Sequence, residues 1–349
     1  MILITSDFLA ERHNTIGYHF NGICSLLEKT IARATFEKTL NFSLSQQSKD
    51  LQFDPVSFFA LSGLKYKGEL PPILDCSRIS DDSLNYAKEF LSNFSLIVGY
   101  ELTRPTIKLL EILGIKYINI WLHPIRYLDD ELFYVTSSDA KFKDILKSIE
   151  VNEDSYFIGA EYARVLINRR HRLNIPESSF VFFGQTSNDK TLRKNEGYFC
   201  VSDFADAISS MASRANKFIY AQHPLRKDKS EREALKYIVG DKLLEVQANG
   251  YQLLSNENVE LVSSISSSIA LEGYFFNKNV VLLRGPTVDI LSGSGVSVGS
   301  SIFNPNIWRS FFGERNSEGE FFWGKKNKIR NILDCYYAYP ILRDHYDQK

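Results

Sequence analysis

The sequence predicts an α/β protein with two Rossmann-like domains that face each other across a cleft. Short apolar runs typical of buried strands alternate with amphipathic segments in both halves of the chain. The 349 residues are more than one such domain needs. Residues 173–178, which contain Pro176, are expected to be a linker between the halves. We therefore expect domains at 1–174 and 175–349, the second ending in helices.

In the first half, β-branched and aromatic runs predict strands, the last of them at a sheet edge: 2–4, 73–76, 94–101, 117–122 and 132–136. Apolar residues at helical spacing predict helices between and after these strands: 16–31, 80–91, 103–113, 140–149 and 155–172. Ser80 and Asp81 favour a helix start, and Gly114 favours a helix end. Residues 40–60 give no clear prediction.

In the second half, apolar runs predict strands at 180–183, 218–221, 259–262 and 280–283. Helices are expected at 202–214, 230–239, 269–276, 308–312 and 329–337. We expect a Gly/Ser-rich loop at 291–301, and residues 243–254 remain unassigned.

The central strand–helix–strand unit organises the candidate site. Its first strand leads into a polar loop with Asp189, and its second ends at Gln222, His223 and Pro224. Ligands of such sheets bind beyond the carboxyl ends of the strands. We therefore expect Asp189 and His223 at the mouth of one crevice.

Composition excludes several classes of function. The net charge of −1 and pI near 6.6 provide no basic field, so nucleic acid is not an expected partner. Four scattered cysteines fit reduced thiols rather than a disulfide framework or a zinc site. No signal peptide or membrane-spanning run is apparent, so we expect a cytoplasmic protein whose membrane contact, if any, is peripheral.

A hydroxyl-rich loop before the helix at 269–276 is a candidate anion site. Ser266, Ser267 and Ser268 would combine hydroxyl donors with the free N–H groups of a helix start. The alternative is a helix cap with surplus serines. Glu272 either accepts hydrogen bonds from ribose hydroxyls or only complements the helix dipole. Neither GxGxxG nor a P-loop motif is present.

Other candidates carry similar alternatives. Asp189 is a nucleophile, a base or a turn residue, and Glu101 has the same ambiguity. His223 either binds a leaving phosphate or is structural. Arg126, near His123, either clamps a carboxylate or pairs with a neighbouring aspartate.

These segments, in this order, resemble the retaining β-Kdo glycosyltransferases of bacterial surface polysaccharides, including capsule enzymes. The resemblance spans residues 96–285 and rests on Gly99-Tyr100-Glu101, His123-Pro124-Ile125-Arg126-Tyr127 with Asp129-Asp130, Phe183-Gly184-Gln185-Thr186 through Asp189, Gln222-His223-Pro224, and Ser266-Ser267-Ser268 with Glu272. The run Lys190-Thr191-Leu192-Arg193 is more basic than the family's pattern.

The resemblance implies a GT-B fold and transfer of Kdo from CMP-Kdo to a polysaccharide or lipid-linked glycan, without metal or cofactor. Asp189 would be the nucleophile of a double displacement, with Glu101 as a second carboxylate and His223 at the phosphate. CMP would contact the second domain, and the acceptor the first. The implied donor contacts are Gln185, Lys190, Thr191, Pro224, Ser266, Ser267, Ser268, Glu272, His123 and Arg126.

Two rival functions stay open. One keeps the fold but changes the reaction, to transfer of another CMP-activated acidic sugar or to nucleotide-sugar epimerisation. The other is a non-catalytic glycan- or nucleotide-binding assembly protein, in which the acids are ordinary turn and cap residues. Substituting Asp189 or His223 separates them, because a binding protein would tolerate both changes.

Overall fold

The computed structural model describes residues 1–9, 18–43, 52–65, 79–170, 173–187, 189–194, 197–226, 228–246, 248–286 and 288–313, with only the backbone at 18–21, 170 and 190. Two compact units share these residues. Unit 1 comprises Met1–His123, Asp130–Val151 and the described chain from Ile290, and unit 2 comprises Pro124–Asp129 and Asn152–Asp289. This division differs from the expected single boundary after residue 174.

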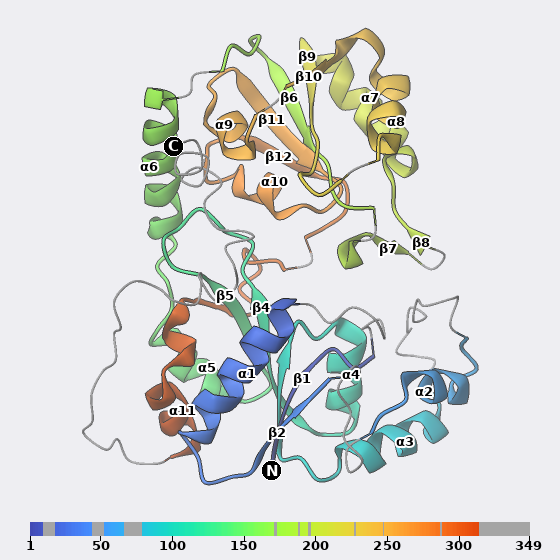
Figure 1. Ribbon diagram of the computed structural model, residues 1–349, viewed down its shortest axis with the longest axis vertical. Coiled ribbons are helices and arrows are strands. Elements are labelled where there is room, and N and C mark those ends of the chain that lie inside the picture. The colour runs from blue at the N-terminus through green and yellow to red at the C-terminus, as the bar shows by residue number, and fades with distance from the viewer. Residues whose placement is uncertain are drawn as a thin grey trace. The chain divides into compact units, whose positions relative to one another are not determined.

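Unit 1 is built on a six-stranded sheet in the order β13-β5-β4-β3-β1-β2 (Figure 1). Its strands are β1 (Ile2–Ser6), β2 (Thr39–Phe42), β3 (Leu96–Tyr100), β4 (Lys116–Leu122), β5 (Phe133–Ser137) and β13 (Val296–Val298). The first four pair in parallel, whereas β5 is antiparallel to both β4 and β13. The expected edge strand therefore lies one position inside the sheet.

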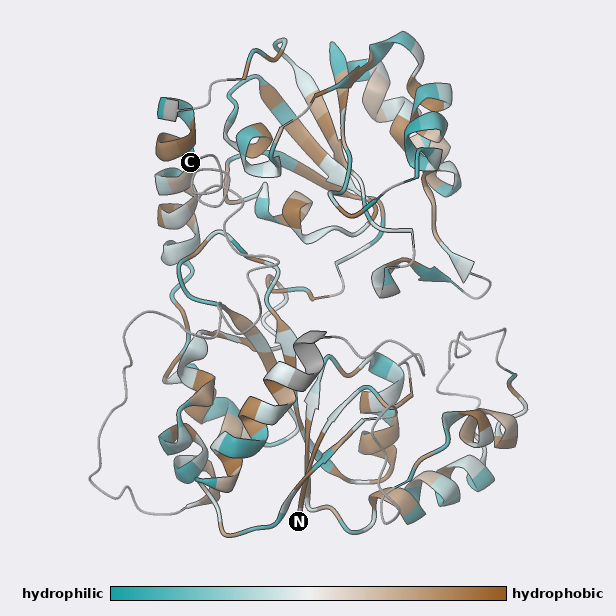
Figure 2. Cartoon of the chain, viewed as in Figure 1, coloured by the Kyte–Doolittle hydropathy of each residue, from teal (hydrophilic) through white to brown (hydrophobic). Residues whose placement is uncertain are grey.

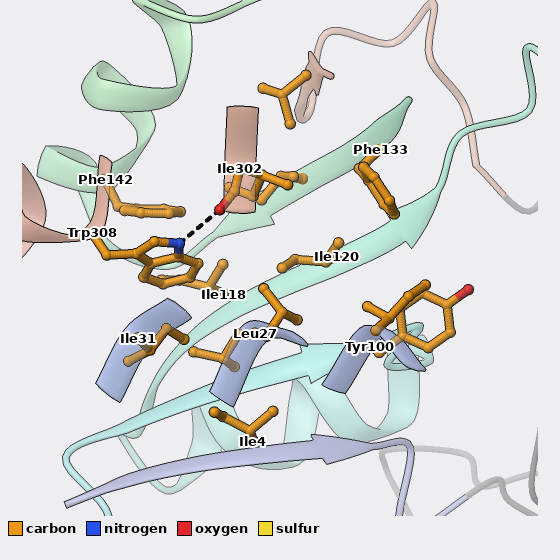
Figure 3. Packing of buried hydrophobic residues seen from close by; sticks show 14 of the residues in the cluster. Ile4, Leu27, Ile31, Tyr100, Ile118, Ile120, Phe133, Phe142, Ile302 and Trp308 are labelled. Atoms are coloured by element: carbon orange, nitrogen blue, oxygen red, sulfur yellow. Dashed lines mark hydrogen bonds between the residues drawn. The ribbon is translucent and has the colours of Figure 1, made fainter. Parts of the chain in front are cut away.

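Helices cover both faces of the unit 1 sheet. They are α1 (Tyr18–Ala32), α2 (Pro55–Leu61), α3 (Asp81–Leu91), α4 (Arg104–Ile112), α5 (Ala140–Lys147) and α11 (Pro305–Phe312). Alternate strand residues divide the core, since Ile2 and Ile4 pack with α1, α5 and α11, and Leu3 packs with α2, α3 and α4. Trp308 of α11 is fully buried and donates to the Ile302 carbonyl at 2.8 Å (Figure 3).

Unit 2 contains an all-parallel sheet in the order β10-β9-β6-β11-β12. The strands are β6 (Ser179–Phe183), β9 (Lys217–Ala221), β10 (Leu243–Glu245), β11 (Val259–Ser264) and β12 (Asn279–Leu282), with a small hairpin of β7 (Arg193–Lys194) and β8 (Gly197–Tyr198). Hydrophobic residues run along the strands in Figure 2, as expected for a sheet covered by helices.

The helices of unit 2 are α6 (Asp154–Arg170), α7 (Ala205–Arg214), α8 (Ser230–Val239), α9 (Gly250–Ser255) and α10 (Ser268–Glu272). Short 3-10 turns add η2 (Lys190–Leu192), η3 (Val201–Phe204) and η4 (Gly240–Lys242), with η5 (Ser300–Phe303) in unit 1. α7 and α8 pack on one face through residues such as Ile208, Met211 and Leu235. α6 packs against α9, which places it in unit 2 rather than in the expected first domain.

The predicted fold class is confirmed, because each unit is a Rossmann-like α/β structure, as in the GT-B architecture. The predicted loop at 291–301 is wrong at Val296–Val298, which forms β13 by pairing with β5. The predicted helix at 269–276 ends at Glu272 and continues as turns. The expected elements at 73–76 and 329–337 lie outside the described residues.

Candidate functional site

The candidate site lies where the strand order of unit 2 reverses. From β6 the chain proceeds to β9 and β10 on one side, and then returns to β11 on the other side of β6. At such a switch point the loops after the two central strands diverge and leave a crevice for a ligand. Here those loops begin at Gly184 and Ile265.

Gln185 joins the two loops. Its Oε1 accepts from the Ser266 backbone N–H at 2.8 Å, and its Nε2 donates to Ser266 Oγ at 3.2 Å. The same Nε2 lies 3.5 Å from Asp189 Oδ2 and 3.4 Å from Thr191 Oγ1. Thr191 and Ser266 are themselves joined by a 2.8 Å hydroxyl hydrogen bond. One buried amide therefore organises a carboxylate and two hydroxyls.

Asp189 is held by a short turn after β6. Its backbone N–H donates to the Thr186 carbonyl at 3.1 Å, and its Oδ1 accepts from the Thr191 N–H at 2.9 Å. The side chain is partly exposed. The turn thus leaves an oriented carboxylate that solvent reaches, so its turn role and a chemical role are compatible.

His223 follows β9 and is partly exposed. Its Nδ1 accepts from the Leu225 N–H at 3.2 Å, so the neutral ring carries its proton on Nε2. Burial lowers the pKa of His223 below the usual 6.5, Asp189 raises it, and Arg226 lowers it further. His223 and Asp189 are therefore close enough to interact electrostatically.

A buried ion pair that sequence reasoning missed supports the Gln185 loop. Arg226 donates to the Gln185 carbonyl at 2.8 Å and lies 3.3 Å from the Glu231 carboxylate. Glu231 also accepts from Tyr220 Oη at 2.8 Å and from the Gln185 N–H. A Cβ at Gly184 would collide with Glu231. Burial raises the pKa of Glu231, whereas Tyr220 and Arg226 lower it.

The serine loop opens α10, but it does so without a side-chain cap. Ser267 is the N-cap, and its hydroxyl makes no capping hydrogen bond, whereas its N–H donates to Ser264 Oγ at 2.8 Å. Ser266, Ser267 and Ser268 are partly exposed. Of these three, the structure links Ser266 directly to Gln185.

Glu272 is buried, with 1% of its surface exposed. Its Oε1 accepts from the Arg126 backbone N–H and, at 3.2 Å, from Tyr251 Oη. Its Oε2 has no hydrogen-bond partner among the described residues. Burial raises the pKa of Glu272 to about 8, and the Arg126 N–H and guanidinium and the Tyr251 hydroxyl act in the opposite direction. Arg126 therefore contacts Glu272 through its backbone N–H, and whether it clamps a substrate carboxylate stays a prediction.

Unit 1 has its own switch point, between β1 and β3, and Glu101 directly follows β3. Glu101 adopts the left-handed region with φ 55°. Its N–H donates to the Ile120 carbonyl at 2.8 Å, and its side chain is partly exposed. A non-glycine residue held in this region costs about 1–3 kcal/mol and is over-represented at functional sites.

Two side chains that sequence reasoning missed clamp the turn after Glu101. Asn119 of β4 accepts from the Leu102 N–H at 2.9 Å and donates to the Leu102 carbonyl at 3.0 Å. Asp7 accepts from the Thr103 N–H and, at 2.6 Å, from the Thr106 hydroxyl. The available signals were a polar residue inside the apolar run of β4 and an acid directly after β1.

The remaining candidates have less definite surroundings. His123 is fully buried at the end of β4, where its Nε2 lies 3.0 Å from Ser297 Oγ of β13. Pro224 is exposed directly after His223. Lys190 begins η2, but only its backbone is described. The site residues as a group stay predictions.

The described residues lack both a metal-binding cluster and a helix that could span a membrane. They contain no cluster of three or more histidine, cysteine or acidic side chains arranged to hold a metal ion. None of their helices combines the length and hydrophobicity needed to cross a membrane.

No protein-family model and no curated protein sequence matches the chain. Similar solved structures include the β-Kdo 2,7 transferase of Thermosulfurimonas dismutans KpsC, with 11% identity, 88% of this chain and 90% of that chain covered, and a TM-score of 0.42. The β-Kdo 2,4 transferase of the same protein has 14% identity, 53% and 67% coverage, and a TM-score of 0.32.

A UDP-GlcNAc 2-epimerase from Neisseria meningitidis is similar at 11% identity over 90% of this chain and 91% of that chain, with a TM-score of 0.29. Identities and TM-scores this low carry no functional argument.

Proposed function

We propose that this protein is a glycosyltransferase that moves Kdo from CMP-Kdo to a glycan or lipid-linked glycan acceptor with retention of configuration. One observation carries the proposal: the Gln185 amide ties the Asp189 carboxylate to Ser266 and Thr191 at the switch point of unit 2. The motif resemblance supplies the donor, and the geometry supports a carboxylate oriented for reaction.

In the proposed first step, a carboxylate oxygen of Asp189 attacks the anomeric carbon of Kdo. The bond from that carbon to the phosphate oxygen breaks, and CMP departs with the bonding electron pair. The Thr191 N–H and the Gln185 amide fix the direction of the carboxylate before reaction. The product is a glycosyl ester on Asp189.

His223 is the proposed partner of the leaving phosphate. Its Nδ1 is occupied as an acceptor, so Nε2–H is the donor that it offers. Its lowered pKa favours the neutral ring at pH 7, which donates without taking a full charge. The proposed reaction needs no metal or cofactor, and we assign the remaining donor contacts to Lys190, Pro224, Ser267, Ser268, Glu272, Arg126 and His123.

In the proposed second step, an acceptor hydroxyl attacks the anomeric carbon and displaces the Asp189 carboxylate. Glu101 accepts the proton of that hydroxyl. Two successive inversions at one carbon retain the configuration. The strained backbone at Glu101 supports a chemical role, because the clamps from Asp7 and Asn119 maintain an otherwise unfavourable conformation.

The test is intact-protein mass spectrometry after incubation with CMP-Kdo. We expect an added Kdo mass that peptide mapping places on Asp189, and no such mass on Asp189→Asn. Acceptor turnover should fall by about a thousandfold or more in that variant, as for other nucleophile replacements. Asp206→Asn, an exposed change on α7 of the same unit, is the matched control and should retain turnover.

Other outcomes separate the rivals. Turnover of a different CMP-activated acidic sugar, but not of CMP-Kdo, would assign another donor. Conversion of a UDP-sugar without acceptor would identify an epimerase. Full activity of Asp189→Asn would rule out a double displacement through Asp189. Absence of CMP-Kdo binding would contradict the proposed donor.

A further inference from the structure

Helix α6 is apolar on two opposite faces. Its inner face buries residues spaced at helical intervals: Tyr156, Ala160, Ala163 and Ile167. On the other side Ile158, Tyr162 and Val165 are 68%, 67% and 62% exposed. The spacing of four and three residues puts these three on one stripe. Packing within unit 2, including that against α9, therefore covers one apolar face of this helix and leaves the other exposed.

Two further aromatic side chains are exposed near the N-terminal end of α6. Phe157 and Tyr274 are 37% and 46% exposed, and their rings are in contact with centroids 5.9 Å apart. Single exposed apolar residues are ordinary, but a contiguous group is typical of an interaction surface. Hydrophobic and hydrophilic residues alternate along α6 in Figure 2.

Opposite charges mark the two ends of the stripe. Asp154 lies four residues before Ile158, and Arg169 lies four residues after Val165. With about 100° of rotation per residue, both fall on the side of the helix that carries the stripe. Both are exposed, and neither has an ion-pair partner among the described residues.

The geometry points to a second copy of this chain as the occupant, with two α6 helices packed antiparallel. A two-fold axis between Glu161 and Tyr162 would place Ile158 against Val165 of the partner subunit. The same axis would place Asp154 against Arg169 of the partner subunit. One symmetry operation thus satisfies both the apolar and the charged pairs, as an isologous interface requires.

An anionic membrane surface fits this stripe less well. Helices that lie on such surfaces combine an apolar face with a basic polar face. Here the exposed Asp154 and the half-exposed Glu161 border the stripe, and Glu161 is paired with Arg164. The helix carries two acidic residues, Asp154 and Glu161, among three arginines, so its charge is not of one sign.

The experiment measures the mass of the full chain by light scattering and sedimentation over a range of concentrations. We expect the wild type to reach twice the chain mass of 40.0 kDa. Ile158→Asp should remain a monomer with an unchanged far-UV CD spectrum. Tyr237→Asp, at a 92% exposed site on α8, is the matched control and should still dimerise.

Charge reversal tests the antiparallel arrangement. Asp154→Arg or Arg169→Asp alone should weaken dimerisation by about tenfold or more, because like charges then face each other. The double variant Asp154→Arg/Arg169→Asp should restore it. A monomeric wild type, an unaffected Ile158→Asp variant or failure of the double variant to recover would each overturn the inference, as would binding of a monomer to anionic vesicles through this face.

Discussion

Glu101 combines a strained backbone with a proposed chemical role. Its φ of 55° places an ordinary side chain where glycine is favoured, and the turn behind it is held by Asn119 and Asp7. Gly99 is equally constrained, since a Cβ there would collide with Leu102. The local structure is therefore built around the conformation of Glu101.

We predict that Glu101→Gly stabilises the protein by up to about 1 kcal/mol, because glycine removes the steric cost of the left-handed region. Glu101→Gln should leave stability unchanged, since it keeps the Cβ. Both variants should lose transfer activity if Glu101 is the base. Urea unfolding measures the first effect, and a less stable Glu101→Gly would show that the backbone there is not strained.

Glu272 gives unit 2 a pH-dependent stability. Its folded-state pKa is raised from 4.5 to about 8 by burial, so the folded protein keeps this proton after the unfolded chain has lost it. Its contribution is fully present below pH 4.5 and is lost as pH rises through about 8. We predict that Glu272→Gln flattens this decline and is more stable than the wild type near about pH 9.

Thermal unfolding across this pH range tests that prediction. If stability declines with pH as steeply in Glu272→Gln as in the wild type, the pKa of Glu272 is not raised in the folded protein. The same variant also tests the proposed donor contact, because weaker CMP binding at constant stability would show that Glu272 reaches the nucleotide.

At the scale of elements, the loop after β6 depends on the segment after β9. Arg226 and Glu231 are 8% and 4% exposed and together hold both backbone groups of Gln185. The parallel pairing of β6 and β9 brings these segments together. The expected βαβ unit was confirmed, but its supporting ion pair follows from packing that no local pattern expresses.

We predict that Arg226→Met destabilises the protein by about 3–5 kcal/mol, because it leaves Glu231 buried without its cation. Arg232→Met is the control, since Arg232 pairs with Glu245 at 2.6 Å on an exposed surface and should cost no more than about 1 kcal/mol. Adding Glu231→Gln to Arg226→Met should recover part of the loss. Chemical denaturation measures all three, and equal effects of the two arginine changes would contradict the argument.

At the scale of the whole molecule, distant segments complete unit 1. β13 pairs with β5, and Trp308 packs against Phe142 with ring centroids 5.1 Å apart (Figure 3). Both segments come from the end of the described chain. A sheet defined by the first 174 residues would lack its outermost strand and the cover of α11.

We predict that a fragment of residues 1–174 does not fold cooperatively, because it exposes the apolar surface that α11 covers. In the full chain, Trp308→Ala should cost about 3–5 kcal/mol through the cavity that it leaves. Calorimetry and near-UV CD test both. A fragment with a sharp unfolding transition would show that β13 and α11 are dispensable for unit 1.

Most regular elements followed from local pattern. Strands such as β3 and β6 are almost continuous apolar runs, and helices such as α3 carry their own cap, with Ser80 accepting from the Ser83 N–H. The strands β2, β10 and β13 were not predicted. Each has four or fewer residues, lacks the three-residue apolar run that predicted the equally short β12, and owes its form to neighbouring strands. A strand this short has no periodicity of its own to detect.

The amino-acid sequence by itself determined the α/β class, the alternation of strands and helices, and the placement of Asp189, His223 and Glu101 just after strands, because these depend on residues close together in the chain. Only the tertiary structure decided which loops meet. Strand order placed Gln185 beside Ser266, 81 residues away, and burial fixed the protonation tendencies of Glu272 and His223. Contacts between distant segments and the loss of water around them set these properties, and both arise only when the chain is packed.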